Sequence, residues 1–132
     1  IEEEYCQPLT VFEHGIVGQT IHHSHLHLLP ASFNLTPKIK RDFPKAEIQP
    51  INGFQELRKS YTKKKQPYLF WSTPSGEQFV CWNPPATPEY FRIASAELLK
   101  VPERASWKKM DQSLDNQLAE DTLERLVPLF TF

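Results

Sequence analysis

The chain has 132 residues, a mass of 15.4 kDa and a formal net charge of −1 at pH 7. That length favours one domain, and the balance of charges argues against a protein that holds duplex nucleic acid by bulk charge. No apolar run of about 18 residues is present, which excludes a transmembrane helix, and no secretory signal opens the chain. We therefore expect a cytoplasmic protein with no membrane or nucleic-acid partner, in which Cys6 and Cys81 stay reduced. Because the chain starts at Ile1 rather than Met, residues upstream of it can be missing.

Twelve prolines and only four glycines predict short elements joined by stiff loops. Residues 10–14 are predicted as a strand, followed by a glycine-flanked loop over 15–20. Residues 21–29 alternate with a period of two, which is the signature of a strand, and Pro30 ends it.

The rest of the chain is predicted as a connecting segment, a helix, a β-hairpin and two further helices. Their residues are 31–50 (with a short strand near 47–51), 52–61, 68–82, a helix from 87 and a helix over 113–126. Asn52 and Thr87 are the expected N-caps of the first two helices, with Pro88 at the first position of the second. Leucines of the last helix are spaced to form one apolar face. The three tryptophans are expected in packing roles, and residues 63–65, all lysine, in a solvated turn.

All five histidines lie between positions 14 and 27. On a strand, residues i, i+2 and i+4 share one face, so His23, His25 and His27 are predicted to project to the same side. His22 would then point to the opposite side, in a packing or solvent role. His14 is interpreted either as a half-buried structural histidine or as part of the same site.

Three imidazoles on one face can bind a transition metal, or one can attack phosphorus while the others bind phosphate oxygens. A cupin-like metal site pairs such histidines with a nearby acid, but Glu13 is the only acid between positions 5 and 41. The segment Gly18-Gln19-Thr20 instead offers an amide, a hydroxyl and backbone N–H groups, which suit a phosphate. The pattern favours phosphorus chemistry without a metal or cofactor, and the metal site remains an alternative.

The residues from His23 to Leu29 resemble the histidine-triad (HIT) pattern His-φ-His-φ-His-φ-φ at every position except Ser24, where an apolar residue is usual. Gly18-Gln19-Thr20-Ile21 is similar to the Gly-Gln-Ser-Val lead-in of the nucleoside-phosphoramidase branch. Residues 11–15 resemble the strand that pairs with the triad strand in such proteins.

This resemblance implies an enzyme, a nucleotide hydrolase or nucleotidyl transferase that acts at the α-phosphate. His25 would form a covalent nucleotidyl-histidine, His27 would bind phosphate oxygens, and His23 would support the geometry of the nucleophile. Gly18, Gln19 and Thr20 would lie near the phosphate and the leaving group. The implied substrates are nucleoside phosphoramidates, dinucleoside polyphosphates or adenylylated molecules, and HIT relatives are often homodimers.

The expected fold is α+β, HIT-like, with an antiparallel sheet and flanking helices in one structural domain. Residues 1–30 would supply the C-terminal strands of a HIT-like domain, and residues 31–132 an extension packed on the same core. Only 22 residues precede His23, whereas a HIT domain has roughly eighty, and an acid or histidine (Glu13 or His14) stands where the phosphoramidase branch has an asparagine. These departures keep open a second function, a non-catalytic nucleotide-binding or scaffold protein. Arg92, on the helix from 87, is interpreted as a surface residue or as a phosphate ligand.

Overall fold

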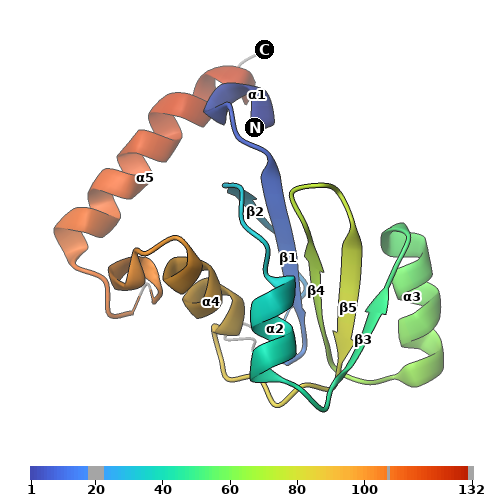
Figure 1. The fold of residues 1–132 in the computed structure, drawn as a ribbon. Helices are drawn as coiled ribbons and strands as arrows, with labels where there is room; N and C mark the ends of the chain where they lie inside the picture. The colour runs from blue at the N-terminus through green and yellow to red at the C-terminus, as the bar shows by residue number, and fades with distance from the viewer. Residues whose placement is uncertain (18–22, 107, 131–132) are drawn as a thin grey trace.

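A five-stranded antiparallel sheet with the strand order β2-β1-β4-β5-β3 forms the centre of the computed structural model, which describes residues 1–17, 23–106 and 108–130 (Figure 1). The expected α+β class with an antiparallel sheet and flanking helices is therefore confirmed. The strands are β1 (Leu9–Gly15), β2 (His27–Pro30), β3 (Glu47–Pro50), β4 (Tyr68–Ser72) and β5 (Gln78–Trp82). The helices are α1 (Glu2–Tyr5), α2 (Thr36–Asp42), α3 (Gly53–Lys64), α4 (Tyr90–Leu98) and α5 (Gln112–Leu126), with 3₁₀ turns η1 (Pro102–Arg104) and η2 (Val127–Phe130).

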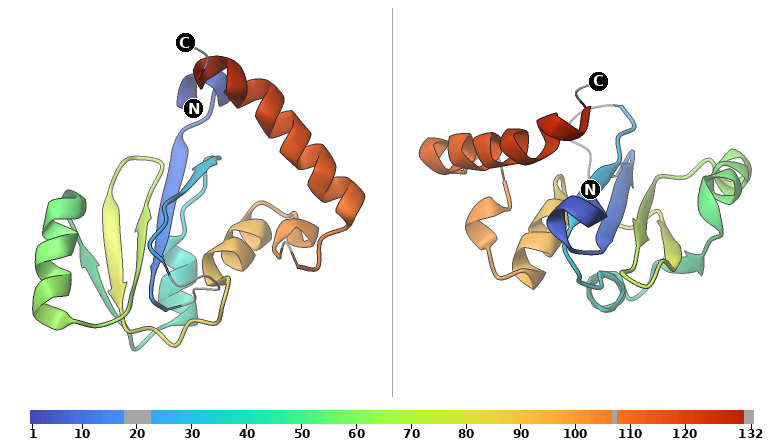
Figure 2. Two further views of the ribbon diagram at one scale, coloured as in Figure 1. Left: turned by 180° about the vertical axis from the view of Figure 1, so that it is seen from behind. Right: turned by 90° about the horizontal axis from the view of Figure 1, so that it is seen from above.

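Helices cover the two faces of the sheet unequally, as Figure 2 shows from behind and from above. Strand residues alternate between two apolar clusters. Phe12, Leu69 and Trp71 pack with residues of α2 and α4 on one face. Phe70 and Val80 pack on the other face with Leu57 of α3. The central strands are thus buried on both sides.

The first predicted strand is confirmed and is longer than expected, because β1 runs from Leu9 to Gly15. The second is shorter than the alternating pattern predicted. It begins only at His27, which pairs with Phe12 of β1, and residues 23–26 precede it without regular structure. The predicted loop over 15–20 and the start of the predicted strand fall largely on residues 18–22, which lie outside the described residues.

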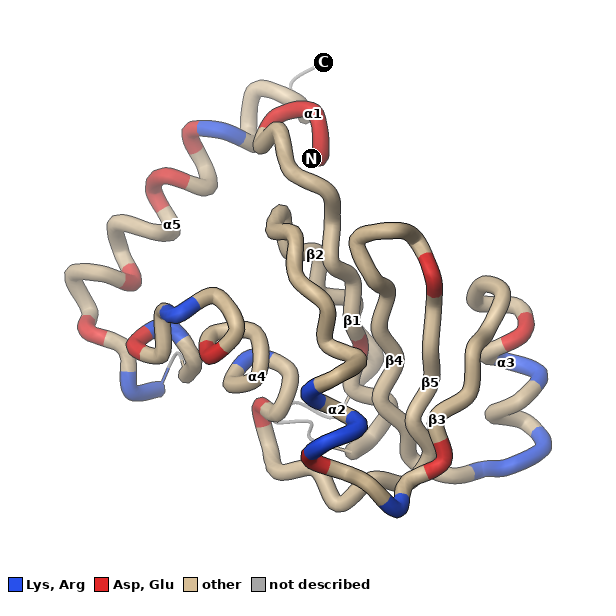
Figure 3. Tube along the Cα trace, in the orientation of Figure 1, with Lys and Arg blue, Asp and Glu red and all other residues tan. Residues whose placement is uncertain are grey.

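The predicted hairpin is confirmed as β4 and β5, whose pairing runs from Tyr68–Trp82 to Ser72–Gln78. The short strand near 47–51 and the helix near 52–61 are confirmed as β3 and α3. Asn52 occupies the N-cap of α3 without a capping bond from its side chain; its backbone N–H instead donates to the Glu56 carboxylate at 2.6 Å. The last turn of α3 contains the first two of the three lysines predicted as a turn. Figure 3 shows where Lys and Arg lie along this helix.

The predicted start of the helix at Thr87 is wrong. Glu89 has a left-handed backbone with φ of 63°, and the Tyr90 N–H donates to the Thr87 carbonyl at 3.2 Å. This turn precedes α4, so the helix begins at Tyr90. Pro88 lies in this turn and not at the first position of the helix. The fixed φ of proline is compatible with either position, so its presence alone does not mark where the helix begins.

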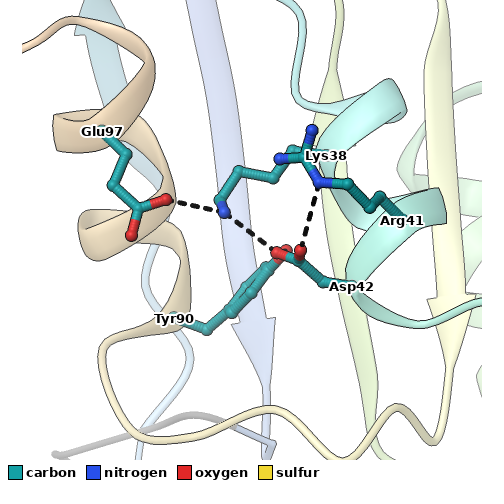
Figure 4. Close-up of polar contacts among 5 residues, drawn as sticks. All are labelled: Lys38, Arg41, Asp42, Tyr90 and Glu97. Atoms are coloured by element: carbon teal, nitrogen blue, oxygen red, sulfur yellow. Dashed lines mark hydrogen bonds and ion pairs between the residues drawn. The ribbon is translucent and has the colours of Figure 1, made fainter.

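The segment predicted as a mere connection contains the helix α2, which is joined to α4 by a polar network (Figure 4). Lys38 Nζ lies 3.1 Å from Asp42 Oδ2 and 2.7 Å from Glu97 Oε2. The Tyr90 hydroxyl donates to the same Asp42 oxygen at 2.9 Å. The hydrogen bond to Glu97 is the main cause that raises the pKa of Lys38. Since Glu97 and Tyr90 both belong to α4, the network fixes α4 over the sheet.

The predicted last helix is confirmed as α5, and Asp111 caps it by accepting from the Leu114 N–H at 3.1 Å. It contains no buried residue, and Leu123 is 60% exposed. The helix extends away from the sheet and returns toward α1 at its C-terminal end (Figure 1), where the Arg125 guanidinium lies 5.2 Å from the centre of the Tyr5 ring. Among the described residues, no helix has the length and apolar character needed to cross a membrane.

Candidate active site around the histidine cluster

Four of the five histidines form a continuous group of rings at the end of β1 and the start of β2. The ring centres of His23 and His25 are 5.2 Å apart, and those of His25 and His27 are 4.8 Å apart. His14, on β1, lies 6.1 Å from His27 in an edge-to-face arrangement. The rings come together although residues 23–26 are not a strand. We call His14, His23, His25 and His27 the histidine cluster.

His27 and His14 are held by the apolar face of the sheet that packs against α4. His27 stacks on Phe12 at 4.7 Å, as expected for cross-strand partners on one face. His14 is 4% exposed, and its Nε2 accepts a hydrogen bond from the Phe91 N–H at 3.2 Å. Because a nitrogen that accepts carries no proton, a neutral His14 has its proton on Nδ1.

His25 is oriented by the backbone of its neighbour. Its Nδ1 lies 3.0 Å from the carbonyl oxygen of His23. A carbonyl can only accept, so Nδ1 must carry the proton in this contact. The neutral imidazole then has its lone pair on Nε2, the atom farther from its own backbone. This arrangement gives the cluster a defined nucleophilic nitrogen.

Two rings of the cluster, His14 and His27, disfavour positive charge. Burial, followed by the charges of His27 and His25, lowers the pKa of His14 to about 4. Burial, followed by the charges of His25 and Arg92, lowers the pKa of His27 to about 4. Both rings are therefore neutral at pH 7, and each offers one N–H donor and one lone pair.

A cavity of about 360 Å³ lies beside His23, on the α3 side of the sheet. Its most prominent polar group is Glu13, which is 5% exposed. The Ser24 hydroxyl and the Tyr68 hydroxyl both donate to this carboxylate, the latter at 3.1 Å. Burial, with the Glu13 carboxylate as a further cause, raises the pKa of Tyr68, so its hydroxyl remains a donor. Tyr61 also lines this cavity. We call it the Glu13 pocket.

A second cavity, of about 430 Å³, lies beside His27 on the α4 side. Its wall is mostly apolar and includes Phe12, Leu29 and Leu99. Arg92 of α4 and Arg104 of η1 also line it. We call it the Arg92 pocket. The histidine cluster thus lies between two cavities of different character, one acidic and one basic.

The structure brings together most of the residues that the sequence singled out. His23, His25, His27 and His14 form the cluster, while Glu13 and Arg92 line the two pockets. Gly18, Gln19, Thr20 and His22 lie outside the described residues. Sequence reasoning missed two tyrosines and two residues near Arg92, because nothing in their local pattern separates them from ordinary strand and helix residues. They are Tyr61, Tyr68, Ser95 and Arg104.

Cys6 is exposed and Cys81 is buried, and both are free thiols, so they do not bridge. Within the described ranges, no group of three His, Cys, Asp or Glu side chains is arranged to hold a metal ion.

Comparison with protein-family models, with curated proteins and with solved structures gives no match for this chain.

Proposed function

We propose that the protein is a HIT-like nucleotide hydrolase or nucleotidyl transferase that acts at the α-phosphate through a covalent intermediate on His25. The observation that carries this proposal is the contact between His25 Nδ1 and the His23 carbonyl. It directs the lone pair of a neutral imidazole to Nε2, as a nucleophile toward phosphorus requires. The resemblance of residues 23–29 to the HIT pattern supports the same role.

The neighbours of His25 suit a phosphoryl group. His27, whose ring lies 4.8 Å from that of His25, is neutral and can donate an N–H to a phosphate oxygen. The Arg92 charge acts on His27, which is why it contributes to the low pKa of that ring. An anion beside His27 would meet a hydrogen-bond donor and a positive charge, both of which stabilise the charge on phosphate oxygens during transfer.

The Glu13 pocket suits the nucleoside part of the substrate. Glu13 accepts two hydrogen bonds from the protein, and a carboxylate has capacity for about four. Its remaining lone pairs can accept from ribose hydroxyls, while the rings of Tyr61 and Tyr68 give a surface on which a base can pack.

The proposed reaction has two steps. First, His25 Nε2 attacks the α-phosphorus, a P–N bond forms, and the bond from phosphorus to the leaving group breaks. The leaving group departs with the bonding electron pair, and the positive charge on the substituted imidazole is shared with the His23 carbonyl through Nδ1–H. Second, water attacks phosphorus, the P–N bond breaks, and its electron pair returns to Nε2. The products are a nucleoside monophosphate and the leaving group. An anionic leaving group such as a phosphate or carboxylate departs as it is, and the proton given up by the attacking water is released. An amine leaving group takes up a proton from water as it departs, which balances the proton given up in the second step.

Turnover distinguishes this proposal from a protein that only binds nucleotides. The purified chain would be assayed with diadenosine polyphosphates, an adenosine phosphoramidate and an adenylylated acid. We expect release of AMP by the native chain and a fall of at least about 10³-fold in His25→Ala. Leu26→Ala, at the exposed position next to His25, is the matched control and should keep its rate. Nucleotide binding with no turnover of any of these substrates would contradict the proposal and favour the non-catalytic alternative.

A further inference from the structure

Three polar side chains, Arg92, Ser95 and Arg104, line the Arg92 pocket beside His27. Ser95 is 4% exposed, and its Oγ has no hydrogen-bond partner among the described residues. A buried hydroxyl without a partner costs about 1–3 kcal/mol and is uncommon in folded proteins. Arg92 and Arg104 make no ion pair with an acidic side chain in the described part of the chain, although Lys38 and Arg41 of the neighbouring helix α2 do.

These groups lie on one side of the same cavity. Arg92, Ser95 and Leu99 are spaced at i, i+3 and i+7 on α4 and its C-cap, so they share one face of the helix. All three line the cavity together with His27 and Arg104. The volume of about 430 Å³ lies in the range of ordinary small-molecule sites.

The chemistry of the walls specifies the ligand. Arginine binds phosphate and carboxylate oxygens through charge-assisted hydrogen bonds, and two arginines repel a cation. The apolar wall made by Leu29, Leu99 and Val101 suits a ligand with an apolar body rather than a bare ion. The Ser95 hydroxyl can donate to or accept from a polar atom of that ligand.

We propose that the Arg92 pocket is the subsite for the leaving group, and that it selects an anionic leaving group with an apolar body over an amine. The assignment rests on the proposed function, because the reaction at His25 defines which part of the substrate leaves. His27 lies at the boundary between His25 and this pocket. An anionic leaving group in the Arg92 pocket can therefore remain attached to the phosphorus that His25 attacks. The nucleoside would then lie on the other side of the histidine cluster, in the acidic Glu13 pocket.

Binding of simple probes tests this pocket without turnover. The native chain would be titrated with 1-naphthyl phosphate, 1-naphthylmethylamine and inorganic phosphate, and followed by the amide resonances of a ¹⁵N-labelled sample. We expect the naphthyl phosphate to bind at least about tenfold more tightly than either other probe. The largest shifts should fall on α4 and η1.

Three variants locate the site. Arg92→Gln should weaken binding of 1-naphthyl phosphate by about tenfold or more, and Ser95→Ala by about threefold or more. Arg58→Gln, on α3 and outside this pocket, is the matched control and should bind the probe as the native chain does. Ser95→Ala should also raise the melting temperature in the absence of ligand, since it removes an unpartnered buried hydroxyl.

The outcome separates the two proposals. His25→Ala should retain binding of 1-naphthyl phosphate, because His25 does not line this pocket. If His25 catalyses turnover but the amine binds the native chain as tightly as the phosphate, the subsite assignment is overturned while the proposed function stands. The same holds if Arg92→Gln binds 1-naphthyl phosphate as tightly as the native chain does. Selective binding of the phosphate with no turnover would leave an anion site on this face but overturn its role as a leaving-group subsite.

Discussion

At the scale of single residues, the surroundings of His14 accept only a neutral imidazole, and those of Gly15 accept only a residue without a side chain. His14 must remain neutral to accept from the Phe91 N–H inside the core. Gly15 lies directly against the ring of Tyr68, where a Cβ atom would collide with the ring. Each of these positions supports a part of the candidate site, and each leads to a prediction about stability.

The low pKa of His14 predicts a loss of stability in acid. Its pKa is about 4 in the folded chain and about 6.5 in an unfolded one. The unfolded state therefore binds more protons between these values, and the free energy of unfolding falls as the pH is lowered from 6.5 toward 4. For His14 we expect a loss of roughly 2 kcal/mol between pH 7.5 and pH 5. Because the pKa of His27 is lowered to about 4 as well, the His14 share is measured by urea unfolding at the two pH values as the difference between the native chain and a variant that lacks His14.

The variant His14→Gln should be less stable at pH 7.5 but should lose about 2 kcal/mol less than the native chain on going to pH 5. Ile39→Val, a core change that does not titrate, is the control and should show the native loss. An equal loss in all three proteins would show that His14 does not titrate with a lowered pKa.

Gly15→Ala should destabilise the fold by about 1–3 kcal/mol, because the added methyl must displace the Tyr68 ring. It should also disturb the hydrogen bond from Tyr68 to Glu13. The same substitution would be made in a Tyr68→Ala background and measured by urea unfolding. There the cost should largely disappear. A cost that is the same in both backgrounds would mean that the contact with Tyr68 is not its cause.

At the scale of elements, α4 and α5 contribute in opposite ways. Phe91 of α4 has no exposed surface and contacts the rings of Phe12, His14 and Trp71. Leu123 of α5 is 60% exposed. Helix α4 packs beside the site, and the network of Lys38 with Asp42 and Glu97 helps to hold this helix in place (Figure 4). Helix α5 contains no buried residue.

This contrast predicts very different costs for truncating the two apolar side chains. Phe91→Ala should lower the free energy of unfolding by about 3–5 kcal/mol, as for other large core residues. It should also abolish activity if the protein stays folded, because Phe91 packs against His14. Leu123→Ala should cost less than about 0.5 kcal/mol. Thermal unfolding of the two variants side by side provides the measurement. A large cost at Leu123 would show that α5 packs against something more than this chain provides.

At the scale of the whole molecule, the elements that were predicted correctly are those with a strong local signal. The hairpin of residues 68–82 has aromatic and β-branched runs around a Pro-Ser-Gly turn. By contrast, α2 was missed because its proline and mixed charges resemble a loop, although Pro37 lies in the first turn, where a helix accepts it. The start of α4 was placed too early because Thr87 and Pro88 also suit a turn.

The sequence indicates which histidines belong to the candidate site, but it does not indicate how the chain places them or which other residues surround them. The spacing of His23, His25 and His27 identified the cluster, and the face-sharing argument placed the rings near one another. Yet of these three histidines only His27 lies on a strand. Local pattern also could not indicate that Ser95 would be buried without a partner, or that Tyr68 would donate to Glu13 from 55 residues away. Such contacts depend on which elements meet in space, and no single segment encodes them.

The measurement that tests the central claim most directly is the capture of the covalent intermediate. The chain would be mixed with an adenosine polyphosphate labelled at the α-phosphate, quenched at millisecond to second times, digested at neutral to mildly alkaline pH and analysed by mass spectrometry. The proposed mechanism predicts one adenylyl group on the peptide that contains His25, bonded to Nε2 and absent in His25→Ala. Adenylylation that persists in His25→Ala, or AMP release at a native rate from that variant, would contradict it.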